Sequence, residues 1–433
     1  MERDKSLAGL LVMVVMSLML FAAPAMAEDP PDPGTTQSFV SGEGVSARPY
    51  IVYTPTTYDP YKPAPLVVMT HGCQTTAEQQ MKANLYNKLA EKEGFVVMYP
   101  DVDVALTMMP GPLRNCWRFY DANSWHRDQG DAAGIAGMTK DTMSQFNIDP
   151  ERVYLMGMSA GSFMTSIMAA AYPDLYAAVG INAGGAYEDA ACLGAPSTFP
   201  VETSAQDART EMGSNARIVP RLVMGGDNDQ GIPPACADKA LEQGLRTNNL
   251  VIGDSQTSPI SLTPSSVREV ANPNPEGYGS TVSEYTDPVG CVIGERWLIH
   301  GMNHFWPGGS SDPSLASFTD PKGPNGAEIS WEFFRRYKKS DTSMPCAEKS
   351  PETPVMTTCK KQKVSYKLPK GAVSAKVTVN GKPVKSVRKR RSLKLTLPAA
   401  IRTRTVVVVK AKMRSGKTRK QRHSYKGCGP ARR

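Results

Sequence analysis

Apolar runs that alternate with stretches of helical spacing make up most of the chain between residues 48 and 338. Continuous apolar runs, which are typical of strands buried on both faces of a sheet, occur at 66–70, 95–99, 153–156, 178–182 and 218–224. Helical spacing occurs at 78–93, 131–146, 234–245 and 327–338, and further strands are expected at 48–53, 281–285 and 295–299. This alternation predicts an α/β fold with a parallel, doubly wound sheet, in which sites form at the carboxyl ends of the strands.

A Gly-x-Ser-x-Gly pentapeptide, residues 157–161, directly follows one of these strands and precedes a helix rich in small residues at 162–171. Ser159 is the candidate nucleophile, because a serine on a sharp strand-to-helix turn holds its hydroxyl clear of the backbone. The flanking glycines are needed where a side chain would collide with the neighbouring strand and helix. An ordinary tight turn between a strand and a helix is the alternative interpretation.

A serine hydroxyl needs a base and an orienting acid to become nucleophilic, and in this fold both follow the serine along the chain. Of five histidines, three precede the serine or lie in the basic tail, namely His71, His126 and His423. His304 is favoured as the base because it lies in the loop after the strand at 295–299, whereas His300 ends that strand and suits a structural role. A metal pair made by both is disfavoured, since Gly301 and Asn303 do not favour the helix that such a pair needs.

The loop after the strand at 218–224 offers two acids, Asp227 and Asp229. Asp229 is preferred as the orienting acid because its extra distance from the strand lets it reach back to the imidazole, while Asp227 suits a loop-capping role. Two backbone N–H groups are expected to form the oxyanion hole, those of Cys73 and Ala160.

The N-terminus predicts export. Basic residues precede an apolar run at 7–23, and residues 25–27 fit the small-x-small rule, so a signal peptide is expected over 1–27. The Pro-rich segment 28–37 is expected to be disordered. The mature protein is therefore predicted to be soluble, secreted and extracellular, without a transmembrane segment.

Export changes the interpretation of the eight cysteines. An even number of cysteines in an oxidising compartment indicates disulfides, here four, and the chain has no Cys-x-x-Cys pair that would favour a metal site. Cys359 and Cys428 bracket the last segment and are expected to pair with each other, although spacing alone does not fix the connectivity.

The formal charge of +9 hides a strong asymmetry. From Ser350 onward the chain has 25 Lys and Arg residues against the single acid Glu352, which gives +24, and the preceding part has 25 basic and 40 acidic residues, which gives −15. Such a step marks a domain boundary. The expected organisation is therefore a catalytic domain over 38–340, a linker over 341–356 and a basic module over 357–433.

The basic module has the pattern of a small β-sandwich. Alternating residues flank Asn380-Gly381, a hairpin signal, and further short strands are expected at 393–397 and 405–409. Its charge favours binding to an anionic cell-wall polymer, an acidic polysaccharide or anionic lipid. Nucleic acid is disfavoured because the protein is expected to be exported and no series of aromatic residues accompanies the charge.

Five motifs in order give the chain a family resemblance. They are His71-Gly72-Cys73, Cys116-Trp117-Arg118-Phe119, Gly157 to Gly161, Gly226-Asp227-Asn228-Asp229, and Asn303 to Gly309. Over residues 39–337 the chain resembles the secreted esterases grouped with short-chain polyhydroxyalkanoate depolymerases, which include feruloyl and acetylxylan esterases. The resemblance implies an α/β-hydrolase domain with Ser159, Asp229 and His304 as triad, and no metal or cofactor.

The resemblance also implies a disulfide between Cys73 and Cys116, and Trp117 and Trp306 are predicted to bind substrate. The chain departs from the family pattern at three places, namely Gln74-Thr75, Arg118-Phe119 and Ser162. These positions are expected to shape the mouth of the site, so the substrate is the property that they affect.

The predicted function is a secreted serine ester hydrolase that acts on a polyester of short hydroxyalkanoates through an acyl-enzyme. A feruloyl or acetylxylan esterase that acts on plant polysaccharide is the alternative. A protein of a different class, a surface-binding scaffold whose hydrolase domain has lost activity, is the third hypothesis. Association with the cell wall through the basic module is compatible with each of them.

Overall fold

A computed structural model describes residues 32–196, 198–253, 259–288, 290–340, 363–379, 382–396 and 405–425. The chain divides into two compact units, residues 1–347 and 348–433. The predicted signal peptide at 1–27, the predicted linker at 341–356 and the predicted bridge between Cys359 and Cys428 lie outside the described residues.

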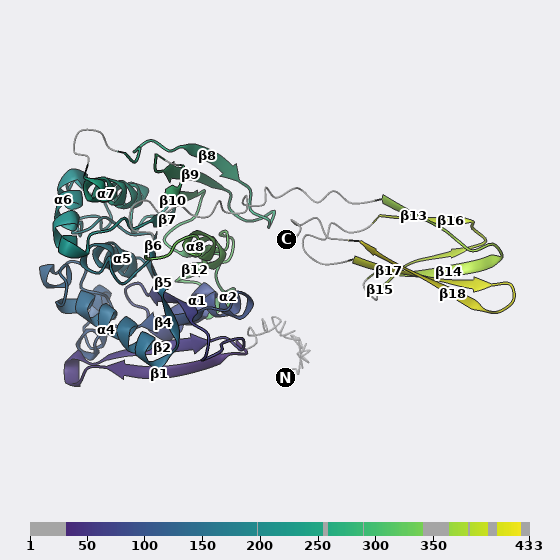
Figure 1. The fold of residues 1–433 in the computed structure, drawn as a ribbon, viewed down its shortest axis with the longest axis horizontal. Helices are drawn as coiled ribbons and strands as arrows, with labels where there is room; N and C mark the ends of the chain where they lie inside the picture. The colour runs from purple at the N-terminus through teal and green to yellow at the C-terminus, as the bar shows by residue number, and fades with distance from the viewer. Residues whose placement is uncertain are drawn as a thin grey trace, which may run out of the picture. The chain divides into compact units, whose positions relative to one another are not determined.

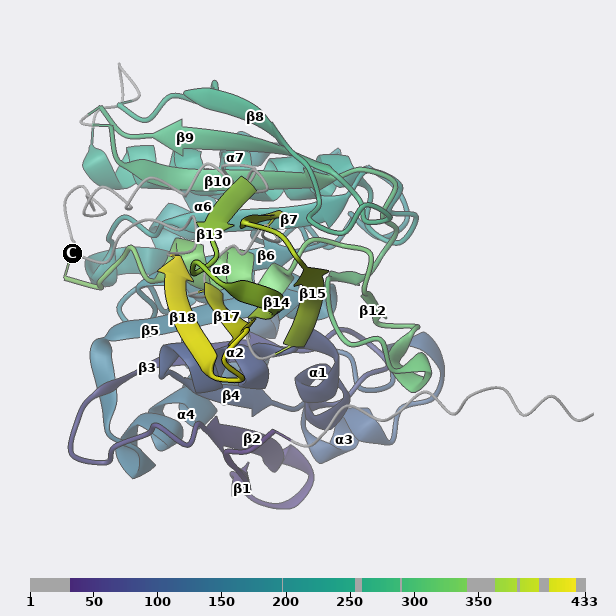
Figure 2. The same ribbon diagram turned by 90° about the vertical axis from the view of Figure 1, so that its right-hand side faces the viewer.

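The first unit is built on a ten-stranded sheet with the order β1-β2-β4-β3-β5-β6-β7-β10-β9-β8 (Figure 1, Figure 2). From β4 to β10 neighbouring strands are parallel, and the pairs at both edges are antiparallel. The strands are β1 (Thr35–Ser41), β2 (Arg48–Thr54), β3 (Ala64–Thr70), β4 (Val96–Pro100), β5 (Ile148–Met158), β6 (Ala178–Asn182), β7 (Arg221–Gly226), β8 (Ser266–Val270), β9 (Ser280–Thr286) and β10 (Val292–Ile299). The predicted α/β class is confirmed, with a mixed sheet whose central part is parallel.

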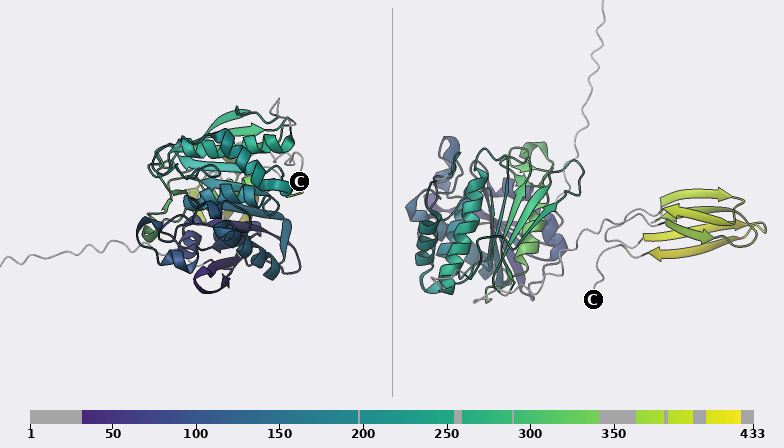
Figure 3. Two further views of the ribbon diagram at one scale, coloured as in Figure 1. Left: turned by 90° about the vertical axis from the view of Figure 1, so that its left-hand side faces the viewer. Right: turned by 90° about the horizontal axis from the view of Figure 1, so that it is seen from above.

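Helices cover both faces of this sheet (Figure 3). They are α1 (Ala77–Asn84), α2 (Tyr86–Glu93), α3 (Val104–Thr107), α4 (Gly130–Gln145), α5 (Ala160–Ala171), α6 (Val201–Met212), α7 (Pro234–Ile252) and α8 (Gly326–Phe334). The cores on the two faces follow from strand alternation, since Leu66 and Val68 of β3 pack with α4 and α5, while Val67 and Met69 pack with α2 and α8. A continuous apolar run is therefore what a strand in this position requires.

Two expectations about local structure were wrong. Strand β1 begins at Thr35, inside the segment 28–37 that was expected to be disordered, and it pairs with β2. An exposed edge strand buries little apolar surface, so its sequence shows no apolar run. The helix expected at 78–93 is broken at Leu85, whose φ is 63°, because the Asn84 side chain accepts the Tyr86 N–H and starts a second helix.

The second unit contains two sheets (Figure 1). Strand β13 (Lys363–Lys367) pairs with β16 (Ser392–Thr396), and the other sheet has the order β15-β14-β17-β18, with β14 (Ala372–Val379), β15 (Lys382–Arg388), β17 (Thr405–Met413) and β18 (Thr418–Tyr425). Tyr366 and Leu393 of the first sheet share a buried core with Val377 and Val409 of the second. Sheets packed on a common core form a sandwich, so the predicted β-sandwich is confirmed.

None of the helices in the described part of the chain is long and apolar enough to span a membrane. Two disulfides join described residues, Cys73 to Cys116 and Cys192 to Cys236, and Cys291 is disulfide-bonded as well. The first of these bridges is the one that the family resemblance implied.

Candidate active site

The turn between β5 and α5 holds Ser159 in a backbone conformation that serine rarely adopts, with φ 53° and ψ −120°. A Cβ atom at Gly157 would lie 2.3 Å from the carbonyl oxygen of Gly161, and one at Gly161 would lie 2.5 Å from that of Thr70. The two glycines are therefore required by close backbone approach, as the sequence predicted. The turn presents a partly exposed Ser159 at the carboxyl end of β5.

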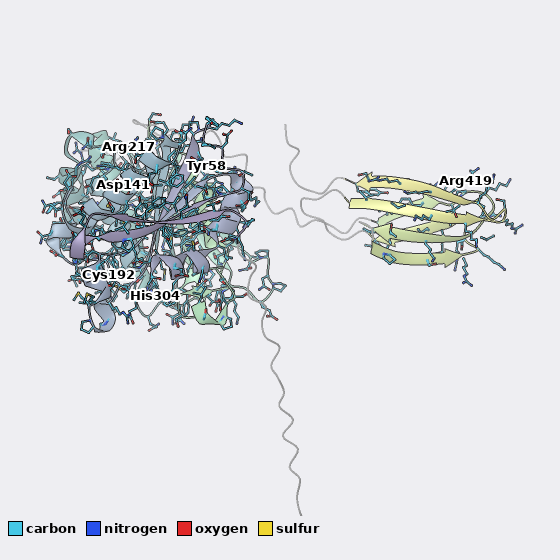
Figure 4. The ribbon with its side chains drawn as sticks, turned by 90° about the horizontal axis from the view of Figure 1, so that it is seen from below. Tyr58, Asp141, Cys192, Arg217, His304 and Arg419 are labelled. Carbon is cyan, nitrogen blue, oxygen red and sulfur yellow. A yellow bond between two sulfur atoms is a disulfide. The ribbon has the colours of Figure 1, made fainter. Side chains whose placement is uncertain are left out.

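Three side chains predicted from the sequence meet at this point. His304 Nε2 lies 2.9 Å from Ser159 Oγ, and His304 Nδ1 lies 2.8 Å from Asp229 Oδ2. Asp229 follows β7 and His304 follows β10, which are neighbouring parallel strands, so both loops leave the same edge of the sheet. The serine, imidazole and carboxylate thus form a continuous hydrogen-bonded chain, and Figure 4 labels His304 within the first unit.

The carboxylate of Asp229 is held in a fixed orientation. Its Oδ1 accepts the backbone N–H groups of Gly231 and Ile232, each at 2.8 Å, and its Oδ2 is the nearer oxygen to the imidazole, at 2.8 Å from His304 Nδ1 against 3.1 Å for Oδ1. The side chain is 2 % exposed, whereas that of His304 is 28 % exposed. A buried carboxylate with two backbone donors fixes the ring orientation that a base needs, while the ring itself stays accessible from the solvent side.

The loops after β7 and β10 are tied together by Asn303, whose importance the sequence did not indicate. Its Oδ1 accepts the N–H of Gln230 at 3.0 Å and that of His304 at 2.8 Å. The imidazole also packs against Gly231, where a Cβ atom would lie 3.1 Å from His304 Cγ. The position of the imidazole therefore depends on backbone contacts that no residue pattern reveals.

The two rejected candidates pair with each other instead. His300 Nδ1 lies 3.0 Å from Asp227 Oδ2, and Asp227 Oδ1 accepts the Gly301 N–H at 2.6 Å, so this aspartate caps the loop as expected. The hydrogen bond to Asp227 raises the pKa of His300, against the smaller effect of burial, and Glu269 raises it further. Each histidine that follows β10 therefore has its own aspartate, and only His304 contacts Ser159.

The loop after β3 approaches the serine closely. A Cβ atom at Gly72 would lie 3.2 Å from Ser159 Cβ, so the backbone at this position lies directly against the nucleophile candidate. In the described residues the Cys73 N–H donates to no backbone acceptor outside regular elements, and the Ala160 N–H, first in α5, has no acceptor within its helix. The assignment of both groups as oxyanion donors stays a prediction.

A buried polar network that the sequence did not reveal supports this loop. His71 is buried, its Nδ1 lies 2.7 Å from the Gly72 carbonyl oxygen, and its Nε2 lies 3.0 Å from Asp101 Oδ1. Burial would raise the pKa of the Asp101 carboxyl, but His71 and the N–H groups of Ala77 and Val102 hold it below its usual range. The one sign of this network in the sequence was the position of Asp101, directly after β4.

Trp117 and Trp306, which were predicted to bind substrate, lie in the core. Both indole rings are fully buried at 0 % exposure, so neither offers a surface to a substrate in this structure. Trp117 Nε1 donates to the His71 carbonyl oxygen at 3.1 Å, and the Trp306 ring packs against Tyr86. Both residues support the loops of the site from within the core.

At two of the three departures from the family pattern, a buried hydroxyl has a structural rather than a mouth-lining role. The Ser162 hydroxyl is buried, and it lies 2.6 Å from the Gly157 carbonyl oxygen and 2.7 Å from that of Asn182. Thr75 is buried and donates to the Gly72 carbonyl oxygen at 2.7 Å. The expectation that Ser162 and Thr75 shape the mouth was wrong, because their hydroxyls fix the backbone of the turn and of the oxyanion loop, whereas Gln74 is exposed.

The third departure forms a partly buried ion network and an aromatic stack. Arg118 contacts Asp103 at 2.7 Å and Asp131 at 2.9 Å. The neighbouring Phe119 ring stacks on Phe163 of α5, with centroids 4.5 Å apart. This segment is therefore packed against the helix that begins just after Ser159.

The arrangement suits acyl transfer, since it combines a serine and histidine in hydrogen-bond contact, an orienting carboxylate and two N–H groups beside the serine. The order of serine, acid and histidine along the chain and their position at the carboxyl edge of the sheet define the class of α/β-hydrolases.

Comparison with known proteins gives the family. The family described as esterase PHB depolymerase matches residues 49–258. Feruloyl esterase B of Thermothelomyces thermophilus is 30 % identical over 228 residues, which are 49 % of this chain and 74 % of that protein. The chain therefore belongs to the PHB depolymerase family of esterases, which places it among the carboxylic ester hydrolases.

Other relatives are similar over different shares of their length. Poly(3-hydroxyalkanoate) depolymerase C of Paucimonas lemoignei is 30 % identical over 255 residues, 56 % of this chain, and the match spans 55 % of that protein. Acetylxylan esterase A of Talaromyces purpureogenus is 28 % identical over 336 residues, 73 % of this chain and 84 % of that protein. Among solved structures, the acetyl xylan esterase from Aspergillus awamori has a TM-score of 0.49 and 21 % identity, covering 63 % of this chain and 94 % of that one.

Proposed function

We propose that this protein is a secreted serine ester hydrolase that cleaves polyesters of short hydroxyalkanoic acids. The single observation that supports it most is the hydrogen-bonded chain from Ser159 through His304 to Asp229. Family membership and the similarity to a poly(3-hydroxyalkanoate) depolymerase support the polyester. The disulfides among described residues support an oxidising, extracellular compartment.

The reaction proceeds by two acyl transfers. His304 Nε2 accepts the hydroxyl proton as Ser159 Oγ attacks the ester carbonyl, and Asp229 stabilises the imidazolium that forms. The N–H groups of Cys73 and Ala160 donate to the tetrahedral oxyanion. The imidazolium protonates the leaving alcohol, and the acyl-enzyme is then hydrolysed by a water from which His304 removes a proton.

A second candidate is hydrolysis of esters on plant polysaccharide. The observation in its favour is the share of each relative's length that this chain matches. This share is 74 % for a feruloyl esterase and 84 % for an acetylxylan esterase, but 55 % for the depolymerase. These two relatives are therefore similar to this chain over most of their own length. The basic module would add attachment to an anionic cell-wall or polysaccharide surface, as its net charge suggests.

The test compares hydrolysis of polyhydroxybutyrate, acetylated xylan and methyl ferulate by the full chain, with Ser159→Ala as the blank. A short-chain p-nitrophenyl ester reports whether the site is active at all. Preference for polyhydroxybutyrate is the expected result. Preference for either plant ester would overturn the polyester assignment, and a folded protein inactive on all four would favour the scaffold hypothesis.

A further inference from the structure

The four-stranded sheet of the second unit has one apolar and one basic face. Val377 of β14 and Val409 of β17 point inward and are buried. Because side chains alternate along a strand, Lys376 and Lys410, their sequence neighbours, point to the opposite face, and both are exposed. Figure 4 shows side chains extending from this unit, with Arg419 of β18 labelled.

The strand register aligns three lysines across this outer face. Lys376 lies directly opposite Lys410 on the neighbouring strand, and Lys410 lies directly opposite Lys420 on the next one. Adjacent strands are about 4.8 Å apart, and like charges directly opposite each other destabilise a sheet. We refer to Lys376, Lys410 and Lys420 as the lysine row.

More positive charge lies on both sides of the lysine row. Toward one end of the strands, Lys412 lies opposite Ser374 and Thr418. Toward the other end, Arg422 lies opposite Val408. The side chains of Lys412 and Arg422 therefore point to the same outer face as the lysine row. The sequence contains no Asp or Glu after Glu352, so the module has no carboxylate side chain of its own with which to neutralise this face.

The other sheet of the module avoids the same repulsion. Lys363 lies opposite Thr396, Lys394 lies opposite Ser365, and Lys367 lies opposite Ser392. In the two-stranded sheet, each of these lysines therefore faces a neutral residue. In the four-stranded sheet, the lysines of neighbouring strands face one another. A face that carries aligned charges at the expense of stability is expected to bind an anionic polymer.

We propose that the lysine row binds an extended acidic polysaccharide with one carboxylate on each sugar. This inference specifies the partner of the surface attachment proposed above, and it does not depend on the ester hydrolase reaction. A polyuronate carries one carboxylate on every sugar ring, and the distance between successive rings is comparable with the spacing between strands. A polysaccharide that lies across the strands would therefore meet one lysine ammonium group on each of the three strands.

Two other anionic partners fit this face less well. Nucleic acid is typically bound by arginine forks and stacked aromatic rings, whereas the aligned residues are lysines. The outward positions beside them carry one arginine and no aromatic ring; they are Ser374, Thr378, Val408, Lys412, Thr418 and Arg422. A membrane surface is typically bound with apolar insertion, and in the described part of the module the exposed large apolar residue is Val384, on edge strand β15 outside the lysine row.

The test compares two full-length variants with equal loss of charge. The row variant is Lys376→Gln/Lys410→Gln/Lys420→Gln, and the control is Lys363→Gln/Lys367→Gln/Lys394→Gln on the other sheet. Titration with polygalacturonate at low salt should show about tenfold weaker binding for the row variant and less than about a threefold change for the control. The row variant should also unfold at a higher temperature than the control, because it removes repulsion between like charges that face each other on neighbouring strands.

Equal weakening in the two variants would overturn the proposal, since it would mean that net charge alone determines binding. Tighter binding of the unaltered protein to polyphosphate, single-stranded DNA or anionic vesicles than to polygalacturonate would also overturn it. Hydrolysis of a soluble p-nitrophenyl ester is measured on the same samples. If the unaltered protein lacks this activity but the row variant alone loses polygalacturonate binding, the proposed hydrolase function fails and the polysaccharide site stands.

Discussion

His304 Nε2 lies 2.9 Å from Ser159 Oγ, although 145 positions separate the two residues in the chain. His300, only four positions earlier, contacts Asp227 instead. The difference arises because His300 directly follows β10 and its N–H donates to Gly279 beside the antiparallel strand β9, while His304 lies further along the loop, whose Met302 carbonyl oxygen accepts the Asn228 N–H after β7.

The first prediction concerns the base. Ser159→Ala and His304→Ala should each lower kcat on a short-chain ester by at least about 10⁴-fold, since nucleophile and base act as a unit. His300→Ala is the matched control and should retain most of the activity. Steady-state kinetics on the three purified variants checks this, and an inactive His300→Ala with an active His304→Ala would refute the assignment.

The second prediction separates the two aspartates. Asp229→Asn should lower kcat by roughly 10⁴-fold, because the amide would favour the wrong imidazole tautomer. Asp227→Asn keeps the shape of the other pair and should change kcat by less than about fivefold. Comparable losses in both variants would show that Asp227 also acts on the reacting groups.

The third prediction concerns the bridge between Cys73 and Cys116, which is expected to hold one of the proposed oxyanion donors in place. Removing it by Cys73→Ser/Cys116→Ser should lower kcat by about 10- to 1,000-fold at a temperature where the far-UV circular dichroism is unchanged. Cys192→Ser/Cys236→Ser is a matched control, since the two bridges span 43 and 44 residues. The two double variants should lose similar stability, and only the first should lose turnover.

If both double variants lost turnover equally, the effect would come from general destabilisation. The oxyanion loop would then keep its position without the bridge, and the contacts of His71, Thr75 and Trp117 would suffice to hold it.

The fourth prediction concerns pH. Asp227 raises the pKa of His300 in the folded state, so the charged imidazole stabilises the fold. The contribution of the charged His300 to the stability of the fold is fully present below the pKa of His300 in the unfolded chain. It is lost as the pH rises through the higher pKa of His300 in the folded protein. The difference in melting temperature between the unaltered protein and His300→Gln should therefore be largest near pH 5 and should shrink toward pH 8. A difference that grew with pH would contradict the charged pair.

The fifth prediction concerns the division of labour between the units. A chain that ends at Ala347, the end of the first unit, should hydrolyse a soluble ester with unchanged kcat/KM, because every residue of the proposed triad and oxyanion hole lies in this unit. Cys291 is disulfide-bonded, and Cys346 is the cysteine left for it if Cys359 and Cys428 pair as expected, so the chain has to extend past Ser340. Loss of activity in a folded protein of this length would assign the second unit to the site.

The sequence predicted the parts of this protein that depend on local pattern. The apolar runs of the central strands, the glycines around Ser159 and the order of acid and histidine along the chain identified the fold class and the three triad candidates. The alternation of the basic module likewise predicted a sandwich. These features were readable because burial on both faces, close backbone approach and strand periodicity each restrict the residue types at a position.

Only the tertiary structure decided which carboxylate faces which imidazole, that Trp117 and Trp306 are buried, and that Ser162 and Thr75 hold the backbone of the site. It also decided that Lys376, Lys410 and Lys420 form one row, because strand order and register are set by pairing between distant segments. Such contacts join residues far apart in the chain, and a single sequence shows what each residue is but not which distant residue it will face.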